Sequence, residues 1–271
     1  MEVHLLPQLA SAERLRGGIA VVIDVLRATT TVIHALASGC TAVYPVVDVE
    51  EARRLVQDNR AKKFLLAGER QGKPLAGFDL GNSPLEHAPL VCQGATLVLT
   101  TTNGTLAMHR AAAAERVLIG AFVNFSAVCE QVLRDSRPIH FVCAGTDGEI
   151  TLEDTLLAGA FVEALCQGVC QPPPKRGKKT APALSRFSLN DGARLAWDCF
   201  EQHGMVIEES LRLSKGGENL LELGYGKDIT AAAQIDRFML VPEVRRDPIR
   251  IEIGAIGMVR RRWPIPHASE D

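Results

Sequence analysis

The sequence lacks the segments that carry a chain into or across a membrane. No apolar run approaches the roughly 20 residues that a membrane-spanning helix needs. Residues 1–18 have neither the basic stretch nor the long apolar core of a signal peptide. We therefore expect a cytoplasmic protein. The net charge of -2 gives no reason to expect a nucleic acid or an anionic membrane as a partner.

The sequence also lacks the usual spacings of disulfide frameworks and zinc sites. Its seven cysteines are scattered, odd in number and without a C-x-x-C pair, which argues against a secreted, disulfide-linked protein. Its seven histidines show neither H-x-H nor H-E-x-x-H spacing, so the sequence does not indicate a zinc site.

Several common catalytic motifs are missing as well. There is no P-loop, no G-x-G-x-x-G after a strand and no G-x-S-x-G elbow. The segment CQPPPKR at residues 170–176 matches the C-x5-R spacing of cysteine phosphatases, but its three prolines have no N–H groups with which to cradle a phosphate. Position 26 is leucine, so Asp24 does not belong to a D-x-D nucleophile motif.

What the sequence does contain is a regular alternation of apolar strands and helices. This alternation predicts βαβ units in an α/β fold, with three layers (α/β/α) and a mostly parallel sheet. The expected strands cover residues 19–23, 41–46, 63–66, 96–99, 116–119 and 139–143. The expected helices cover residues 30–38, 49–57, 103–114, 126–134 and 152–167.

Composition shifts divide the chain into three parts. Residues 1–169 form the expected sheet core, with most of the site motifs, and residues 170–187 read as a basic, Pro-rich insertion or linker. Residues 188–271 form a helical C-terminal part packed on the same domain. Its expected helices cover 191–203, two short stretches within 205–223, and 229–238, before a return to one or two strands. A homo-oligomer is possible.

Polar side chains follow the ends of four expected strands. Ligands bind beyond the carboxyl ends of the strands in such sheets, so these side chains are expected to share one edge. They are Asp24, Arg27, Thr29 and Thr30; Glu69 and Arg70, with Asp79, Asn82 and Ser83 in the following loop; Thr101, Thr102, Asn103 and Gly104; and Asp147, Glu149, Glu153 and Asp154.

This edge combines two chemistries. Its carboxylates suit Mg²⁺, which takes oxygen ligands. The TTTNGT segment at residues 100–105 lies between a strand and a helix, where N–H groups bind anions, and Arg27 offers a bidentate contact to an oxyanion. Each feature also has a structural interpretation: Asp24 and TTTNGT as turn caps, Glu153 and Asp154 as first-turn acids, and Arg70 as a surface charge. Their occurrence together favours a site.

The motifs VVIDVLRATTT, GERQGKPLAGFDLGNSP, TTTNGT and CAGTDGEITLEDTLLAG, in this order, resemble the 2-phosphosulfolactate phosphatase family. The later stretch SKGGENLLELGYGKDITAAAQIDRFMLVP resembles the C-terminal signature of that family. The resemblance covers residues 19 to 242 and departs from the family at 170–184 and in the basic tail. It implies a Mg²⁺-dependent enzyme that hydrolyses 2-phospho-3-sulfolactate to 3-sulfolactate and phosphate, a step of coenzyme M biosynthesis, on an α/β fold distinct from the common phosphatase folds.

Together the motifs and the resemblance yield a set of expected roles. The expected catalytic residues are Asp24, Arg27 and Asp79, with Asp228 and Asp236 as alternative acids or bases. The expected Mg²⁺ ligands come from Asp24, Glu69, Asp147 and Glu149. The small polyanionic substrate is expected to contact Thr29, Thr30, Arg70, Asn82, Ser83, Thr101, Thr102, Asn103, Gly104 and Lys215.

Two other functions stay open at this point. One is a metal-dependent hydrolase or lyase that acts on another small phosphorylated or sulfonated acid, because a site can be kept while its substrate changes. The other is a non-catalytic anion-binding protein, which the many acids along one edge disfavour.

Overall fold

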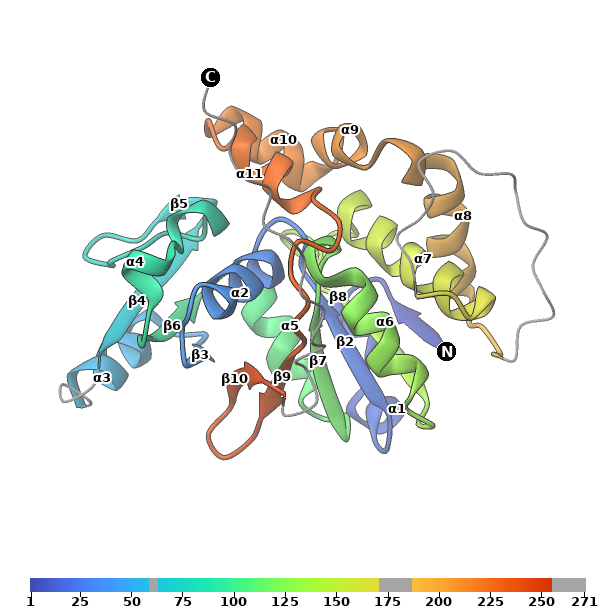
Figure 1. Ribbon diagram of the computed structural model, residues 1–271, viewed down its shortest axis with the longest axis horizontal. Coiled ribbons are helices and arrows are strands. Elements are labelled where there is room, and N and C mark those ends of the chain that lie inside the picture. The colour runs from blue at the N-terminus through green and yellow to red at the C-terminus, as the bar shows by residue number, and fades with distance from the viewer. Residues whose placement is uncertain (59–62, 171–186, 255–271) are drawn as a thin grey trace, which may run out of the picture.

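The computed structural model describes residues 1–58, 63–170 and 187–254, and a sheet of ten strands forms the centre of this part (Figure 1). The strands lie in the order β1-β8-β2-β7-β9-β10-β3-β6-β4-β5. Their bounds are β1 Glu2–His4, β2 Ile19–Ile23, β3 Ala42–Pro45, β4 Phe64–Arg70, β5 Lys73–Pro74, β6 Thr96–Thr100, β7 Arg116–Gly120, β8 Ile139–Cys143, β9 Pro242–Arg245 and β10 Arg250–Ile253.

Strand β2 shows why the apolar runs form this sheet. It pairs in parallel with β7 on one side and β8 on the other. Ile19, Val21 and Ile23 belong to one hydrophobic cluster, whereas Ala20 and Val22 belong to a second cluster on the opposite face. All five side chains are buried, as expected for a parallel strand covered on both faces.

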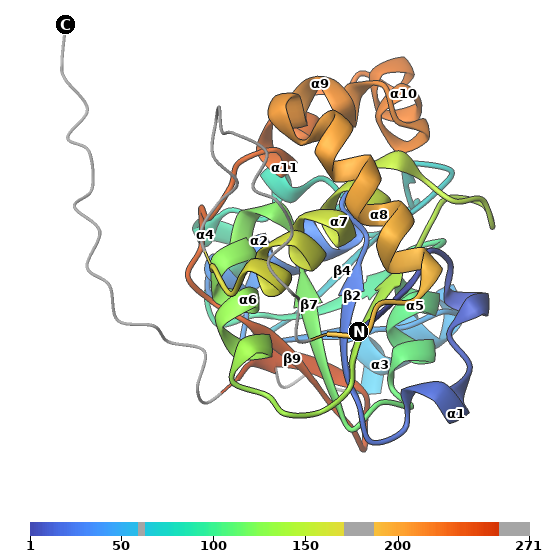
Figure 2. The same ribbon diagram turned by 90° about the vertical axis from the view of Figure 1, so that its right-hand side faces the viewer.

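Helices cover both faces of the sheet, which confirms the predicted α/β class with a mostly parallel sheet. Helices α6, α7 and α8 contribute to the first cluster and helices α2 and α5 to the second (Figure 2). The helices are α1 Ala12–Leu15, α2 Ala28–Ala37, α3 Val49–Asp58, α4 Pro89–Cys92, α5 Gly104–Ala111, α6 Phe125–Leu133, α7 Leu152–Gln167, α8 Asp191–His203, α9 Ile207–Arg212, α10 Lys215–Glu222 and α11 Gly226–Ala232. Short 3-10 turns cover Pro7–Leu9, Pro84–Glu86, Phe122–Asn124 and Gly204–Val206.

The C-terminal return to strands was predicted, and the structure adds its position. Strands β9 and β10 form an antiparallel pair that enters the middle of the sheet, between β7 and β3. Both contacts with the parallel strands are antiparallel. The last strands of the described chain therefore join the two halves of the sheet.

Two predicted boundaries differ most from the structure. The predicted 229–238 helix is α11, which ends at Ala232, because the N–H groups of Asp236 and Phe238 donate to the carbonyls of Phe122 and Val123 instead of continuing the helix. The predicted strand 63–66 continues to Arg70, since a tight turn at Gln71 and Gly72 lets β5 pair with β4. Both turn residues have positive φ, as a type I′ hairpin turn requires.

Strand β1 was not predicted. It has only three residues, too few for a periodic pattern, and its pairing partner β8 lies far along the chain. Residues 171–186 and 255–271 fall outside the described residues, so the proposed division at 170–187 and the C-terminal limit of the last part stay predictions. None of the helices in the described ranges is long and apolar enough to cross a membrane.

Candidate active site

A cavity of about 350 Å³ opens at the carboxyl edge of the sheet. It is lined by the segments that follow β2, β4, β6 and β8, which is the meeting of strand ends that the sequence predicted. Helix α10, from the C-terminal part, lines it as well through Gly216, Asn219, Leu220 and Glu222. In Figure 1, α10 and α11 lie beyond this end of the sheet.

Asp24 is buried at the end of β2 and lines the cavity. Its Oδ1 accepts a hydrogen bond of 3.0 Å from the backbone N–H of Ala28, so the predicted turn-capping role is present. Burial, followed by the negative charges of Asp154 and Glu69, raises the pKa of Asp24 to about 8. Capping and a position in the cavity therefore coexist in this one side chain.

Asp154 and Glu153 begin helix α7 and differ in their partners. The carboxylate of Asp154 accepts hydrogen bonds of 2.9, 3.1 and 3.0 Å from the N–H groups of Val25, Ala144 and Gly145. Asp154 thus ties the end of β2 to the end of β8. Glu153 is also buried, but its Oε2 has no hydrogen-bond partner among the described residues.

The buried carboxyl groups near the cavity repel one another. Burial and the charge of Glu153 raise the pKa of Asp154 to about 7, and burial raises that of Glu153 to about 7. Glu153, Asp154 and Asp24 thus place three buried carboxyl groups close together, and the positively charged side chains nearby do not offset the rise in their pKa values. A bound cation would supply further positive charge, since an opposite charge favours the ionised carboxylate.

Arg27 lines the cavity, and hydrogen bonds to Asp228 and Gly72 fix its guanidinium. Its Nη1 donates to Oδ2 of Asp228 over 2.8 Å, and its Nη2 donates to the carbonyl of Gly72 over 3.0 Å. Asp228 also accepts a 2.7 Å bond from Ser83, and the guanidinium lies 4.6 Å from the ring centre of Tyr225. The arginine is therefore fixed in one orientation, and the buried Asp228 is its positioning partner.

Glu69 organises the loop that follows β6. Its Oε1 accepts bonds of 2.9 and 3.1 Å from the backbone N–H and the hydroxyl of Thr102, and its Oε2 accepts a 2.7 Å bond from the N–H of Gly72. Thr101 and Thr105 cap each other through reciprocal 3.1 Å bonds from N–H to hydroxyl. The TTTNGT segment is thus a capped turn that also faces the cavity, and one of its N–H groups is occupied by Glu69.

The structure brings half of the residues expected in the site to the cavity. Those that line it are Asp24, Arg27, Glu69, Asn82, Thr101, Thr102, Asn103 and Asp147. Those that are not among its lining residues are Thr29, Thr30, Arg70, Asp79, Ser83, Gly104, Glu149 and Lys215. The individual roles of all of these residues stay predictions.

The contacts of the second group explain their position. Thr29 and Thr30 are buried, and their hydroxyls donate to the carbonyls of Asp24 and Val25. Asp79 is exposed, lies in the segment that follows β5 and accepts a hydrogen bond from the N–H of Leu66. Other expected polar groups also hold the fold: Arg70 donates to the carbonyls of Glu69 and Val47, and Asp236 accepts from Ser126 at the start of α6.

The strand-end argument missed the contribution of helix α10. The sequence had indicated this helix only through Lys215, its first residue, and through the segment SKGGENLLE, which lies in the motif that resembles the family signature. A Cβ at Gly216 would overlap Oε1 of Glu153, so glycine permits the close approach of α10 to α7 at the cavity wall.

The donor set of the cavity fits Mg²⁺. Asp24, Glu69 and Asp147 are among its lining residues and offer the hard oxygen ligands that Mg²⁺ prefers. The unpartnered Oε2 of Glu153 adds a second observation in favour of a nearby cation. A separate cluster of Glu2, His4 and His140 is a possible metal site of another kind, and none of its members lines the cavity.

We expect alanine at position 104 to disturb the carboxylate of Asp24. A Cβ at Gly104 would lie 2.5 Å from Oδ2 of Asp24 and would also overlap the Cβ of Ala28. Since a displacement of about 1 Å can lower a rate about 100-fold, we expect kcat/KM of Gly104→Ala to fall by roughly that factor. Steady-state assays measure this, and thermal unfolding followed by circular dichroism shows whether the variant folds.

Gly226→Ala is the matched control. Among the described residues, the nearest atom to a Cβ there would be Cδ2 of Leu221 at 3.4 Å, an ordinary contact, and Gly226 is not among the residues that line the cavity. Wild-type kcat/KM in a folded Gly104→Ala variant would contradict the close packing of Gly104 against a working Asp24.

Fold and site together define an enzyme class. Carboxylates and an arginine of fixed orientation line one cavity beyond the strand ends of an α/β sheet. These groups suit a hydrolase that acts on a small phosphate ester. The profile of the 2-phosphosulpholactate phosphatase family matches residues 4–247, and the chain belongs to this family of phosphoric monoester hydrolases.

Curated relatives agree with this assignment. The chain is 39% identical over 231 residues to a "Probable 2-phosphosulfolactate phosphatase" of Symbiobacterium thermophilum, with 85% of this chain and 93% of the relative covered. Proteins of the same name from Thermotoga petrophila and Deinococcus radiodurans are 41% and 40% identical over 223 and 226 residues. These matches cover 82% and 83% of this chain and 87% and 86% of the relatives. The family resemblance of the motifs is thereby confirmed.

Proposed function

We propose that this protein is a Mg²⁺-dependent phosphatase that hydrolyses 2-phospho-3-sulfolactate to 3-sulfolactate and inorganic phosphate, as in coenzyme M biosynthesis. The observation that carries the proposal is the cavity in which Asp24, Glu69 and Asp147 face the same space as Arg27. Family membership supports the phosphatase chemistry, and the names of the curated relatives support this substrate.

The cavity suits a small polyanion. The proposed substrate carries phosphate, carboxylate and sulfonate groups on three carbons, and a volume of about 350 Å³ is at the lower end of the range for small-molecule sites. The guanidinium of Arg27, oriented by Asp228 and Gly72, offers N–H groups to one of these oxyanions. The hydroxyl and amide groups of Thr101 and Asn103 supply further polar contacts at the wall.

Phosphoryl transfer depends mainly on positioning and on neutralisation of charge. Asp24 is the first residue that we assign as a ligand of Mg²⁺, with Glu69 and Asp147 as the other candidates on the wall. Bound Mg²⁺ would neutralise negative charge on the phosphate and lower the pKa of a water molecule. Arg27 would bind the phosphoryl oxygens, and Glu69 would hold the Thr102 loop against the substrate.

Of the alternative acids, Asp228 acts best as a positioning residue. Both of its carboxylate oxygens are already engaged, Oδ2 with Arg27 and Oδ1 with Ser83. Its contribution to hydrolysis is therefore the fixed orientation of the guanidinium. These two contacts leave neither carboxylate oxygen of Asp228 free for proton transfer.

The test is phosphate release from chemically prepared 2-phospho-3-sulfolactate, compared with 2-phospholactate, which differs by lacking the sulfonate. We expect kcat/KM to be at least about 100-fold higher for the sulfonated compound, because a site built for a charged group rejects the analogue that lacks it. Equal rates would favour a phosphatase for another acid. No phosphate release from either compound would favour the non-catalytic anion-binding function.

Removal of divalent metal should abolish this activity. We expect dialysis against EDTA to reduce phosphate release to background, and Mg²⁺ to restore it. Ca²⁺ should restore little, because it takes more ligands at longer distances. The measurement is a rate titration with each ion, and undiminished activity after exhaustive chelation would refute the requirement for a metal.

A further inference from the structure

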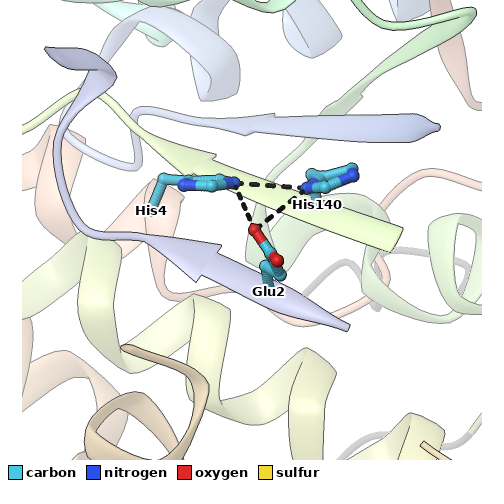
Figure 3. Close-up of side chains that lie close together, drawn as sticks. All are labelled: Glu2, His4 and His140. Carbon is cyan, nitrogen blue, oxygen red and sulfur yellow. Dashed lines mark hydrogen bonds and ion pairs between the residues drawn. The ribbon is translucent and has the colours of Figure 1, made fainter. Parts of the chain in front are cut away.

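Three side chains at the edge of the sheet converge away from the active site. Glu2 and His4 project from β1 on the same face, and Glu2 pairs in register with His140 on β8. Figure 3 shows the three side chains pointing toward one another. None of them lines the active-site cavity.

The three facing atoms form a nearly regular triangle. Nε2 of His4 lies 3.2 Å from Nδ1 of His140, and Oε2 of Glu2 lies 3.5 and 3.7 Å from these two nitrogens. In a tetrahedral site, two ligand atoms lie about 1.63 bond lengths apart, so these separations correspond to metal–ligand bonds of about 2.1 Å, close to the Zn–N and Zn–O bonds of about 2.0–2.1 Å. The triangle already has the size of one face of a tetrahedral zinc site.

The surroundings of the triangle favour a metal over a simple ion pair. His4 and His140 are buried, and Oε2 of Glu2 is a buried atom without a hydrogen-bond partner among the described residues. Two buried imidazoles that face each other can form only one N–H···N bond, and this bond leaves the carboxylate oxygen unsatisfied. A cation at the centre would satisfy all three atoms at once.

We propose that Glu2, His4 and His140 form a binding site for a transition-metal dication, with Zn²⁺ as the ion that fits best. Two imidazoles and one carboxylate are a zinc ligand set, whereas Mg²⁺ prefers oxygen ligands only. The site is thus distinct in chemistry and in place from the carboxylates of the active-site cavity.

Arg14 forms an ion pair with this cluster. Its Nε lies 3.5 Å from the same oxygen of Glu2, and its side chain is 56% exposed. An exposed pair of this kind contributes little free energy, so the arginine can turn into solvent when a metal binds. Arg14→Gln should therefore leave zinc affinity unchanged or raise it.

The site would act as a clamp for the N-terminal strand. Among the described strands, β1 is a short edge strand that pairs with β8 only. A metal that joins two side chains of β1 to one of β8 adds a cross-link between these strands. Binding to the folded state alone also raises stability.

The experiment is a zinc titration of the full-length protein without a polyhistidine tag, after removal of metals with a chelator. Competition with a chromophoric zinc chelator measures the dissociation constant, and elemental analysis measures the stoichiometry. We expect one tightly bound Zn²⁺ that persists in Asp24→Asn. His4→Gln and His140→Gln should weaken zinc binding by more than about 100-fold. Loss of a residue that only hydrogen-bonds to a metal ligand already lowers metal affinity about 10–100-fold, and these histidines would be ligands themselves.

His203→Gln is the matched control, since His203 is an exposed histidine at the end of α8. It should bind zinc as the wild type does, and Zn²⁺ should raise the unfolding temperature of both but not of His4→Gln. Glu2→Gln, at a partly exposed position, tests the site if a histidine variant does not fold. Absence of tight zinc binding in the wild type, or equal binding in wild type, Glu2→Gln and the folded histidine variants, would overturn the proposal.

Discussion

Replacing Asp24 with asparagine is expected to abolish Mg²⁺-dependent phosphate release from a protein that stays folded. Asparagine keeps the oxygen that accepts from the N–H of Ala28 but removes the charge that faces the cavity. Removal of a single electrostatic contact to a transition state typically costs about 10²–10³ in rate, and loss of a metal ligand should cost at least the upper end of this range. The measurement is kcat/KM at saturating Mg²⁺.

The same variant carries a prediction about stability. The pKa of Asp24 is raised to about 8 by burial and by the charges of Asp154 and Glu69, so its ionised form destabilises the folded state. Without Mg²⁺, the protein therefore loses stability as pH rises from the unfolded value of about 4 through 8. Asp24→Asn should unfold at a higher temperature than the wild type near pH 8, and this advantage should disappear near pH 4.

The control for this prediction is Asp198→Asn on the exposed side of α8. It makes the same chemical change at an exposed side chain, so both the activity and the unfolding temperature should match those of the wild type. If Asp24→Asn retained near-normal turnover, Asp24 would be a structural cap only.

Replacement of Arg27 by alanine or lysine is the second change with a large expected effect. The guanidinium is buried between Asp228 and the carbonyl of Gly72, beside the ring of Tyr225. Lysine has neither the paired N–H donors of the guanidinium nor a planar group that can stack on the ring. We expect kcat/KM of Arg27→Lys to fall by about 100-fold or more through lost stabilisation of transition-state charge. Steady-state assays against the wild type measure this fall.

Stability separates the two Arg27 variants. Arg27→Ala leaves the buried carboxylate of Asp228 without its charged partner, a loss that typically costs about 3–5 kcal/mol, whereas lysine keeps a positive charge nearby. Denaturant unfolding measures this difference. Arg53→Lys, in an exposed pair with Glu50, is the control and should change neither stability nor activity. Wild-type kcat/KM in a folded Arg27→Lys variant would remove Arg27 from the site.

Local sequence patterns predicted most of the fold, because apolar periodicity is a property of consecutive residues. The strand at 19–23 and the helices at 152–167 and 191–203 have the predicted bounds. Patterns failed where distant partners decide the backbone. The segment after Ala232 leaves the helix because its N–H groups find carbonyls near Phe122, and three residues become β1 because β8 lies beside them.

The candidate site divides in the same way. The chain order of strands and helices was enough to place Asp24, Arg27, Thr102 and Asp147 at one edge, since parallel strands end together. It did not distinguish polar groups that face the cavity from those, such as Thr30, whose hydrogen bonds hold the backbone.

By itself, the sequence determined the class of this protein, the edge of the sheet that carries its chemistry and, through ordered motifs, its family. Only the tertiary structure decided which side chains meet across long separations in the chain: Arg27 with Asp228, α10 with the cavity, and Glu2 and His4 with His140. The physical reason is that periodicity and capping act over a few residues. Ion pairs, metal ligands and cavity walls depend instead on distances that exist only after the sheet has assembled.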